Sequence, residues 1–258
     1  MDLSLAGRVV LITGGVRGVG AGITRAFLSA GAQVVTCARR PPDRPIQEAG
    51  RTPEHLPCDV RDPAQVETLI DSITRQHGRL DVLVNNAGGA PFAMAADASP
   101  RFHAKVVELN LLAPLLVSQA ANRVMQDQDG GGTIVMVSSV SGRRASPGTA
   151  AYGAAKAGID NLTATLAVEW APKVRVNALA VGMVRTELSH LHYGDEAGIA
   201  AVGRTVPLGR LADPAEIGSC AVFLASPLAS YVSGATLPVH GGGESPAFLS
   251  ASTSREVP

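Results

Sequence analysis

Tyr152, Lys156 and Ser139 are the residues whose types and spacing suit acid–base chemistry. If the segment 152–156 is helical, Tyr152 and Lys156 lie one turn apart on the same face. The ammonium group of Lys156 then favours the phenolate of Tyr152, so the pattern predicts a lowered phenol pKa. Such a phenol can take a proton from an alcohol or donate one to a developing alkoxide. Ser139 ends the apolar run 134–139, where it would donate a hydrogen bond to the same oxygen.

A glycine-rich turn near the start of the chain suggests a phosphate site. A β-branched run at residues 8–13 leads into a turn with Gly14, Gly18 and Gly20, and an amphipathic stretch follows at residues 21–30. Strand, glycine turn and helix form the context of a dinucleotide site, because the backbone can approach the diphosphate and the helix N-terminus offers free N–H groups. The spacing differs from Gly-x-Gly-x-x-Gly, and a glycine turn without a ligand is the alternative.

These motifs, with two more, resemble the short-chain dehydrogenase/reductase family along nearly the whole chain. The matching segments are Thr13-Gly14-x-x-x-Gly18-x-Gly20, Asn85-Asn86-Ala87-Gly88, Asn110, and the set Ser139, Tyr152 and Lys156. The resemblance implies that Asn110 supports a water in a proton relay and that Lys156 also holds the nicotinamide ribose. The residues expected to bind a nicotinamide cofactor are Gly14, Arg17, Gly18, Val19, Arg39, Asp59, Val60, Asn86, Ala87, Gly88, Tyr152, Lys156, Gly182, Val184 and Thr186.

The periodicity of the chain predicts an α/β fold. Helical patterns separate six apolar runs, at residues 9–13, 34–38, 80–85, 133–137, 174–180 and 235–239. Such βαβ units predict a single-domain, doubly wound parallel sheet of Rossmann type with helices on both faces. Ligands of such sheets bind outside the carboxyl ends of the strands. Thr13, Asn86, Ser139 and Gly182 fall at expected strand ends, so we expect them to line one cleft.

The domain organisation is read as one catalytic unit with a variable segment and a tail. We expect residues 1–243 to form the catalytic domain, about 187–211 to form a substrate lid, and the polar segment 244–258 to be mobile or packed at a subunit interface. The resemblance implies a homotetramer or homodimer, with the helix at 151–171 at an interface.

Composition excludes several classes of partner. Lys+Arg and Asp+Glu both number 22, so the chain has no electrostatic footprint for nucleic acid. No unbroken apolar run has the length of a membrane span, and the first residues lack the features of a secretion signal. Cys37, Cys58 and Cys220 are widely spaced, and the apolar surroundings of Cys37 and Cys220 indicate buried thiols rather than disulfides or metal ligands. We expect a cytoplasmic enzyme without a metal.

The second expected strand gives the cofactor preference. Ala38 stands where NAD-preferring relatives carry Asp, and Arg39 follows it directly; Arg17 adds a second cation at the glycine turn. A carboxylate would repel a 2′-phosphate, whereas guanidinium groups bind it with charge-assisted contacts. The residues therefore favour NADP(H). NAD(H) is the alternative, in which the arginines are only solvated. The proline-rich segment 40–45 is too short to promise a full helix.

Two positions depart from the family pattern. Val181 replaces a proline before Gly182, so we expect a looser turn with cofactor binding retained. His240 stands where the family has Asp before two glycines, and we interpret it as a structural substitution rather than a catalytic base.

The favoured reaction is NADPH-dependent reduction of a hydrophobic ketone to a secondary alcohol. One alternative is a catabolic dehydrogenase of a hydroxyacyl-CoA or sterol-like alcohol. A CoA ester could meet Arg143 and Arg144, and the lid adds His190, His192 and Tyr193. A 3-oxoacyl-carrier-protein reductase is disfavoured because the segment 125–129, which would meet the acidic carrier, is not basic. A non-catalytic dinucleotide sensor is a remote alternative, since both Tyr152 and Lys156 are present.

Overall fold

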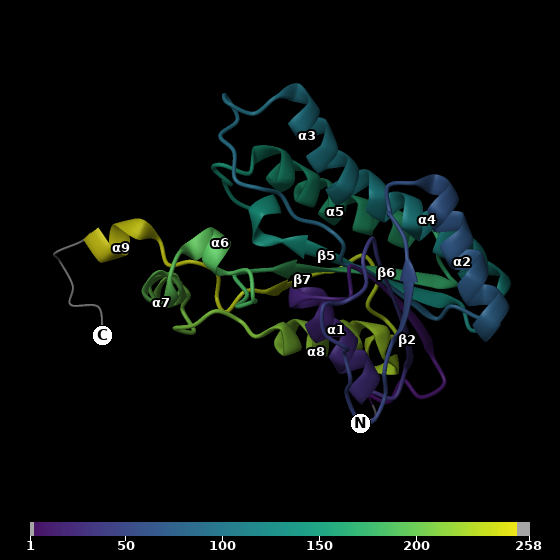
Figure 1. The fold of residues 1–258 in the computed structure, drawn as a ribbon. Helices are drawn as coiled ribbons and strands as arrows, with labels where there is room; N and C mark the ends of the chain where they lie inside the picture. Colours follow the sequence, from purple (N-terminus) through teal and green to yellow (C-terminus); the bar gives the residue numbers. More distant parts are fainter. Residues whose placement is uncertain (1–2, 252–258) are drawn as a thin grey trace.

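The computed structural model describes residues 3–251, and their core is one seven-stranded parallel sheet (Figure 1). The strand order is β3-β2-β1-β4-β5-β6-β7, so the predicted doubly wound parallel sheet is confirmed. The chain reverses direction across the sheet between β1 and β4, and ligands of such sheets bind at this switch point. The strands are β1 (Val9–Thr13), β2 (Gln33–Ala38), β3 (Glu54–Pro57), β4 (Val82–Asn85), β5 (Gly132–Ser139), β6 (Val174–Val181) and β7 (Thr236–Val239).

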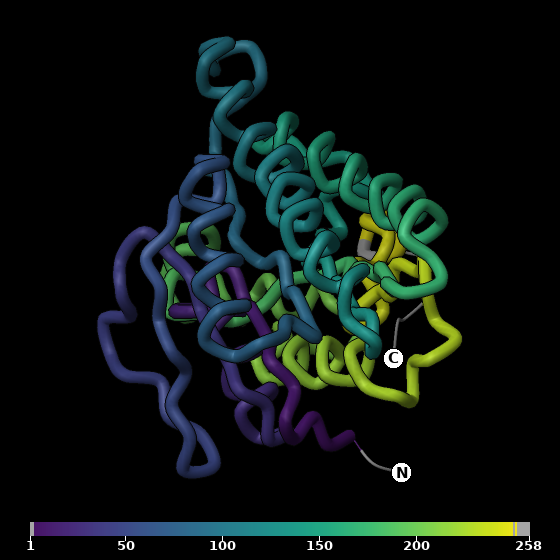
Figure 2. Tube along the Cα trace, turned by 90° about the vertical axis from the view of Figure 1, so that its right-hand side faces the viewer, coloured from purple at the N-terminus to yellow at the C-terminus, as the bar shows by residue number. Residues whose placement is uncertain are grey.

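Helices cover both faces of the sheet, as Figures 1 and 2 show. One hydrophobic cluster fills the space under α2, α4 and α5, and a second lies under α1 and α8. Successive residues of β1 point to opposite faces of the sheet: Val9 and Leu11 lie in the first cluster, and Val10 and Ile12 lie in the second. This is expected for a strand covered on both faces. The helices are α1 (Gly18–Ser29), α2 (Pro63–His77), α3 (Pro100–Val107), α4 (Ala113–Asp127), α5 (Ala150–Glu169), α6 (His190–Tyr193), α7 (Glu196–Thr205), α8 (Pro214–Ala225) and α9 (Ala247–Ala251).

A buried carboxylate ties the amino ends of β1 and β4 together. Asp81 accepts a hydrogen bond from the Val9 N–H at 2.9 Å and forms ion pairs with Arg8 at 2.8 Å and Arg79 at 2.5 Å. Burial acts to raise the pKa of the Asp81 carboxyl, but the hydrogen bonds from Arg79, Val9 and Arg8 outweigh it, so the pKa is lowered. This end of the sheet is therefore fixed electrostatically, opposite the end that carries the functional residues.

The sequence did not predict β3. Two of its four residues are polar, and the strand lies at the sheet edge and is only partly buried, so it shows no apolar run. The segment between β2 and β3 forms no helix, as its prolines predicted, and contains one isolated bridge between Glu48 and Arg51. Strands β5 and β6 both reach further toward their carboxyl ends than expected, to Ser139 and Val181.

The helical stretch Pro100–Asp127 satisfies the length and composition of a membrane span, and it is the one such stretch within residues 3–251. Its most apolar window is 44% buried inside the fold. Val117, Ala121 and Met125 of α4 lie in the hydrophobic cluster beneath it. The packing of α4 on the sheet accounts for the buried part of this apolar stretch.

The cysteines and the tail complete the description. All three cysteines are free thiols; Cys37 and Cys58 are buried, whereas Cys220 is only half-buried, so the expectation of a buried Cys220 was wrong. No cluster of His, Cys, Asp or Glu that could hold a metal occurs in the described part of the chain. The tail projects from the body with the short helix α9 (Figure 1), and residues 252–258 of the tail lie outside the described residues.

Candidate active site

The glycine turn after β1 packs tightly against the end of β4. The Asn86 Nδ2 group donates to the carbonyl oxygens of Thr13 at 2.9 Å and Gly14 at 3.1 Å, and the Thr13 hydroxyl accepts from the N–H groups of Asn86 and Ala87. Gly14 has φ +63°, and a Cβ there would lie 3.0 Å from the Cα of Ala87. A Cβ on Gly20 would lie 2.1 Å from the Gly14 oxygen. Gly14 and Gly20 therefore have no room for a side chain, and the turn leads directly into the N-terminus of α1.

The carboxyl end of β5 and the first turns of α5 bring three predicted residues together. The Ser139 side chain lies close enough to Tyr152 for a hydrogen bond that acts to lower the phenol pKa. The Lys156 ammonium lies 5.5 Å from the centre of the Tyr152 ring and donates to the Val137 carbonyl at 2.7 Å. Tyr152 and Lys156 stand one turn apart on α5, as their spacing predicted.

The electrostatics of this cluster differ from the expectation. Burial raises the pKa of Tyr152, and the hydrogen bond from Ser139 only partly opposes this; the neighbouring Tyr193 acts in the same direction as burial. Lys156 is not among the groups that shift this pKa, and its ammonium donates to the Val137 carbonyl. Burial lowers the pKa of Lys156 itself to about 8, and the negative charge of Asp160 opposes that shift. The predicted lowering of the Tyr152 pKa is therefore not found in the protein alone.

Asn110 sits in a π-helical turn, Glu108–Leu112, between α3 and α4. Its fully buried side chain donates to the carbonyls of Gly89 at 3.0 Å and Val106 at 2.8 Å, and accepts from the Gly89 N–H at 2.8 Å. A Cβ on Gly88 would lie 2.7 Å from the Asn110 Oδ1 atom and 3.6 Å from the Lys156 Nζ atom. Asn110 thus fixes the segment after β4 beside Lys156. Such π-turns are frequent at functional sites.

The segment after β6 closes the other side of the site. Val181 continues β6 and pairs with Val239 of β7 and Ser139 of β5, so the turn is not loosened by the absent proline. His240 packs directly against Gly182. A Cβ on Gly182 would come within 2.7 Å of the His240 Cβ, so position 182 has no room for a side chain. This contact agrees with the structural interpretation of His240. Val184 forms an isolated bridge with Ala212.

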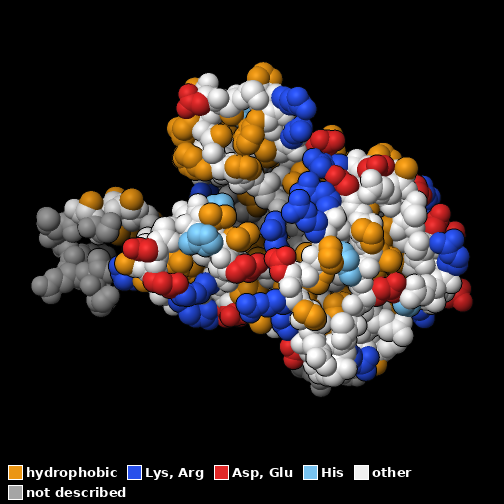
Figure 3. Space-filling view, in the orientation of Figure 1, with side chains coloured by type: hydrophobic (Ala, Val, Ile, Leu, Met, Phe, Trp, Pro, Cys, Tyr) orange, Lys and Arg blue, Asp and Glu red, His pale blue; other side chains and the backbone are white. Residues whose placement is uncertain are grey.

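The residues expected at the adenosine end lie at the ends of β2 and β3. Arg17 and Arg39 are exposed, and neither forms an ion pair within residues 3–251. The hydrogen bonds from Arg61 lower the pKa of the Asp59 carboxyl, and the charge of Arg39 adds to this shift. Figure 3 shows Lys and Arg side chains gathered in the middle of this face. Val60 is buried in the core, so only its backbone can face a ligand.

Two contacts at the mouth of the site were not predicted. Tyr193 of α6 lies close enough to Tyr152 to affect its pKa. Arg144 pairs with Glu244 of the tail at 2.5 Å, and both charges act on Tyr193. The sequence named Tyr193 and Arg144 as neighbours of the substrate but gave no signal for the Glu244 pairing, which joins residues 100 apart.

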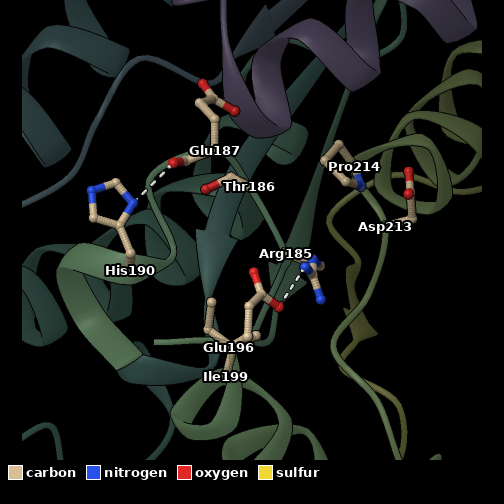
Figure 4. A pocket seen from close by; sticks show the side chains of 8 residues that line it. All are labelled: Arg185, Thr186, Glu187, His190, Glu196, Ile199, Asp213 and Pro214. Atoms are coloured by element: carbon tan, nitrogen blue, oxygen red, sulfur yellow. Dashed lines mark hydrogen bonds and ion pairs between the residues drawn. The ribbon is translucent and has the colours of Figure 1, made fainter. Parts of the chain in front are cut away.

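A cleft of about 470 Å³ lies between the segment after β6, α7 and the start of α8 (Figure 4). The catalytic side chains do not line it. Its residues are Arg185, Thr186, Glu187, His190, Glu196, Ile199, Asp213 and Pro214. Thr186 is the one predicted cofactor residue among those that line this cleft. The cleft therefore adjoins the candidate cofactor site and is not the site itself. In Figure 3 a hollow also separates the lobe with α6 and α7 from the lobe with the segment before α3.

Known proteins share this arrangement. A family model described as enoyl-(acyl carrier protein) reductase matches residues 14–244. The chain belongs to the short-chain dehydrogenase/reductase family. The resemblance in the motifs is thereby confirmed, and like its relatives this short-chain dehydrogenase/reductase is an oxidoreductase acting on alcohols.

Individual relatives extend over nearly the whole chain. A D-threitol dehydrogenase of Mycolicibacterium smegmatis is 36% identical over 93% of this chain and 94% of its own. A 3α-hydroxysteroid dehydrogenase of Mediterraneibacter gnavus is 35% identical over 95% of this chain and 100% of its own. The structure of a Pseudomonas aeruginosa RhlG/NADP active-site complex superposes with a TM-score of 0.84 at 28% identity, covering 93% of this chain and 98% of that one.

Proposed function

We propose that this protein is an NADP(H)-preferring oxidoreductase that interconverts a secondary alcohol and a ketone, with reduction of a hydrophobic ketone as the favoured reaction. The observation that carries the proposal is the hydrogen bond between Ser139 and Tyr152 beside the buried ammonium of Lys156. Two hydroxyl groups converge there on the position that a carbonyl oxygen would take.

The glycine turn suits a dinucleotide, because Gly14 and Gly20 let it pack against Asn86 and Ala87 and the N-terminus of α1 follows it directly. A nicotinamide dinucleotide supplies or accepts the hydride when bound. The residues that would hold it are the fifteen named from the motifs, with Gly14, Gly18 and Val19 at the diphosphate and Gly182, Val184 and Thr186 at the nicotinamide. Val19 and Ala87 pack on the core, so their backbone makes these contacts.

In the reducing direction, Ser139 and Tyr152 polarise the carbonyl of the substrate, and Tyr152 gives its proton to the developing alkoxide. The raised pKa keeps Tyr152 protonated at neutral pH, which suits a proton donor. Lys156, which is charged below its pKa of about 8, would hold the nicotinamide ribose one helix turn from the phenol. Asn110 has one acceptor position left on its Oδ1 atom for a relay water.

The preference for NADP(H) is supported by Arg17 and Arg39. Both guanidinium groups are exposed at the expected 2′-phosphate position and have no carboxylate partner in the described chain. The solved structure of the similar protein RhlG is that of a complex with NADP. NAD(H) remains the alternative if the arginines are only solvated.

A neutral substrate is favoured over a CoA ester. Arg143 pairs with Asp160 at 2.9 Å and Arg144 pairs with Glu244, so the two cations considered for an anionic end are already neutralised. Two exposed apolar side chains, Phe92 and Met94, lie near the start of α5, in a segment whose Ala93 N–H donates to the Gly148 carbonyl. These features support a small hydrophobic alcohol or ketone.

Oxidation of a polyol or sterol-like alcohol is the second candidate, because the D-threitol and 3α-hydroxysteroid dehydrogenases are among the similar proteins. We also propose a single catalytic domain at 1–243 with a substrate lid at about 187–211, in a cytoplasmic homotetramer or homodimer. Val168 of α5 is 81% exposed and Leu112 is 53% exposed, which supports an interface along α4 and α5.

Tyr152→Phe tests the mechanism directly. We expect this variant to lose turnover with model ketones and NADPH while its cofactor affinity stays within a few-fold of the wild-type value. Tyr231→Phe is a matched control and should keep full activity, because that tyrosine is fully exposed and its hydroxyl has no hydrogen-bond partner within residues 3–251. Retained turnover in Tyr152→Phe would contradict the proposed role of the phenol.

A further inference from the structure

The N-terminus of α1 lacks a cap from its own sequence. Its N-cap residue, Arg17, makes no side-chain capping bond, and the first turn contains no acidic residue. By contrast, α2 and α8 are capped by Asp62 and Asp213, which accept from the N–H groups of their own first turns. The free N–H groups at the start of an α-helix need acceptors and attract negative charge.

A carboxylate from the segment after β6 supplies the missing cap. The Glu187 Oε1 atom accepts a hydrogen bond from the Gly18 N–H at 3.0 Å, across 169 residues of sequence. Gly18 also faces Thr186, whose Cγ2 atom would lie 3.5 Å from a Cβ at that position. In Figure 4 the Glu187 side chain, at the edge of the cleft, points toward the start of α1.

The turn that carries Glu187 is held by its own hydrogen bonds. The Thr186 N–H donates to the hydroxyl of the buried Ser189 at 2.8 Å, and the Ser189 N–H donates to the Thr186 carbonyl at 3.1 Å. His190 contacts the Glu187 carbonyl through its Nδ1 atom at 3.1 Å. Glu187 is thus placed by an ordered turn at the beginning of the proposed lid.

The same N-terminus is where the proposed function places the diphosphate of the cofactor, and the inference rests on that proposal. A diphosphate and a carboxylate cannot share these N–H groups without charge repulsion. We propose that Glu187 is a displaceable cap of α1: it fastens the start of the lid to the glycine turn in the free enzyme and gives up its position to the diphosphate. Cofactor binding then releases this fastening, so lid position and cofactor occupancy are coupled.

Titration of NADPH, and separately of NADH, into wild-type protein, Glu187→Ala and Glu187→Gln tests the proposal. Loss of a helix cap corresponds to about 0.5–2 kcal/mol, so Glu187→Ala should bind either dinucleotide about 2- to 30-fold more tightly. The diphosphate is common to both cofactors, so the ratio of their dissociation constants should not change. Glu187→Gln should show the same direction with a smaller gain, since its amide oxygen can still accept.

Glu196→Gln is the matched control. Its carboxylate lines the same cleft but pairs with Arg185 at 2.7 Å, so cofactor affinity should stay within about twofold. Thermal melting adds a second readout: without cofactor Glu187→Ala should melt below the wild type, and saturating NADPH should remove the difference.

Unchanged or weaker cofactor binding in Glu187→Ala, beside normal binding by the wild type, would overturn the displaceable cap alone. An unchanged melting temperature of the free variant would do the same. If the wild type binds neither dinucleotide, the proposed function fails, and this inference fails with it.

Discussion

Replacing Arg39 should change the discrimination between the two dinucleotides rather than binding as such. NADPH and NADH differ only in the 2′-phosphate, so the ratio of their dissociation constants isolates the contacts to that group. Arg39 follows β2 at the expected phosphate position, and Arg17 lies at the start of α1. Both are exposed and unpaired by any carboxylate of residues 3–251, so no internal ion pair must break before they bind.

The magnitude follows from their exposure. A hydrogen bond to a charged group contributes about 1.5–3 kcal/mol when it is well shielded. Solvent screening at an exposed site reduces this, and we take about 0.7–1.5 kcal/mol for each guanidinium. At 1.4 kcal/mol per tenfold, Arg39→Ala should weaken NADPH binding about 3- to 12-fold and leave NADH binding nearly unchanged. Arg17→Ala should act in the same direction.

Fluorescence or calorimetric titrations of both dinucleotides give the ratio for each variant. The selectivity of the wild type should also fall as salt rises, because the contacts are exposed. Arg204→Ala is a suitable control, since Arg204 is equally exposed but lies on α7. Equal losses for NADPH and NADH in Arg39→Ala would refute the reasoning, as would an unchanged ratio in both single variants.

Three further predictions concern the sheet, the glycine turn and the proton donor. Asp81→Asn should lower the free energy of unfolding, measured by urea denaturation, by about 2–3 kcal/mol. The folded pKa of Asp81 is depressed, so the stability that its carboxylate contributes to the wild type should be present above about pH 4 and lost below it. Gly20→Ala should abolish the melting shift with NADPH, since its Cβ would lie 2.1 Å from the Gly14 oxygen; a normal shift would contradict the tight turn. In the reducing direction kcat/KM should fall as pH rises through about 8, where Lys156 loses its charge. Asp160→Asn should move this fall to lower pH, because the Asp160 charge raises the pKa of Lys156. A kcat/KM that stays constant to alkaline pH would exclude a role for charged Lys156.

Much of the fold was predictable because it rests on local patterns. The six apolar runs correspond to strands, since buried parallel strands are nearly continuous hydrophobic segments. Strand β3 was missed because its partly exposed edge position requires no such run. At the site, Tyr152, Lys156 and Ser139 lie where their spacing placed them. The contact from Glu187 to Gly18 could not be predicted, because it depends on how two distant turns meet in space.

The protonation state of Tyr152 shows most clearly where sequence reasoning stops. Its spacing to Lys156 was correct, yet the expected pKa shift had the wrong direction, because spacing does not report how deeply a helix face is buried. In the folded protein burial outweighs the hydrogen bond from Ser139, and the Lys156 ammonium is turned toward the Val137 carbonyl. A phenol that stays protonated at neutral pH is already in the form that donates a proton to an alkoxide, whereas oxidation of an alcohol must begin by removing that proton.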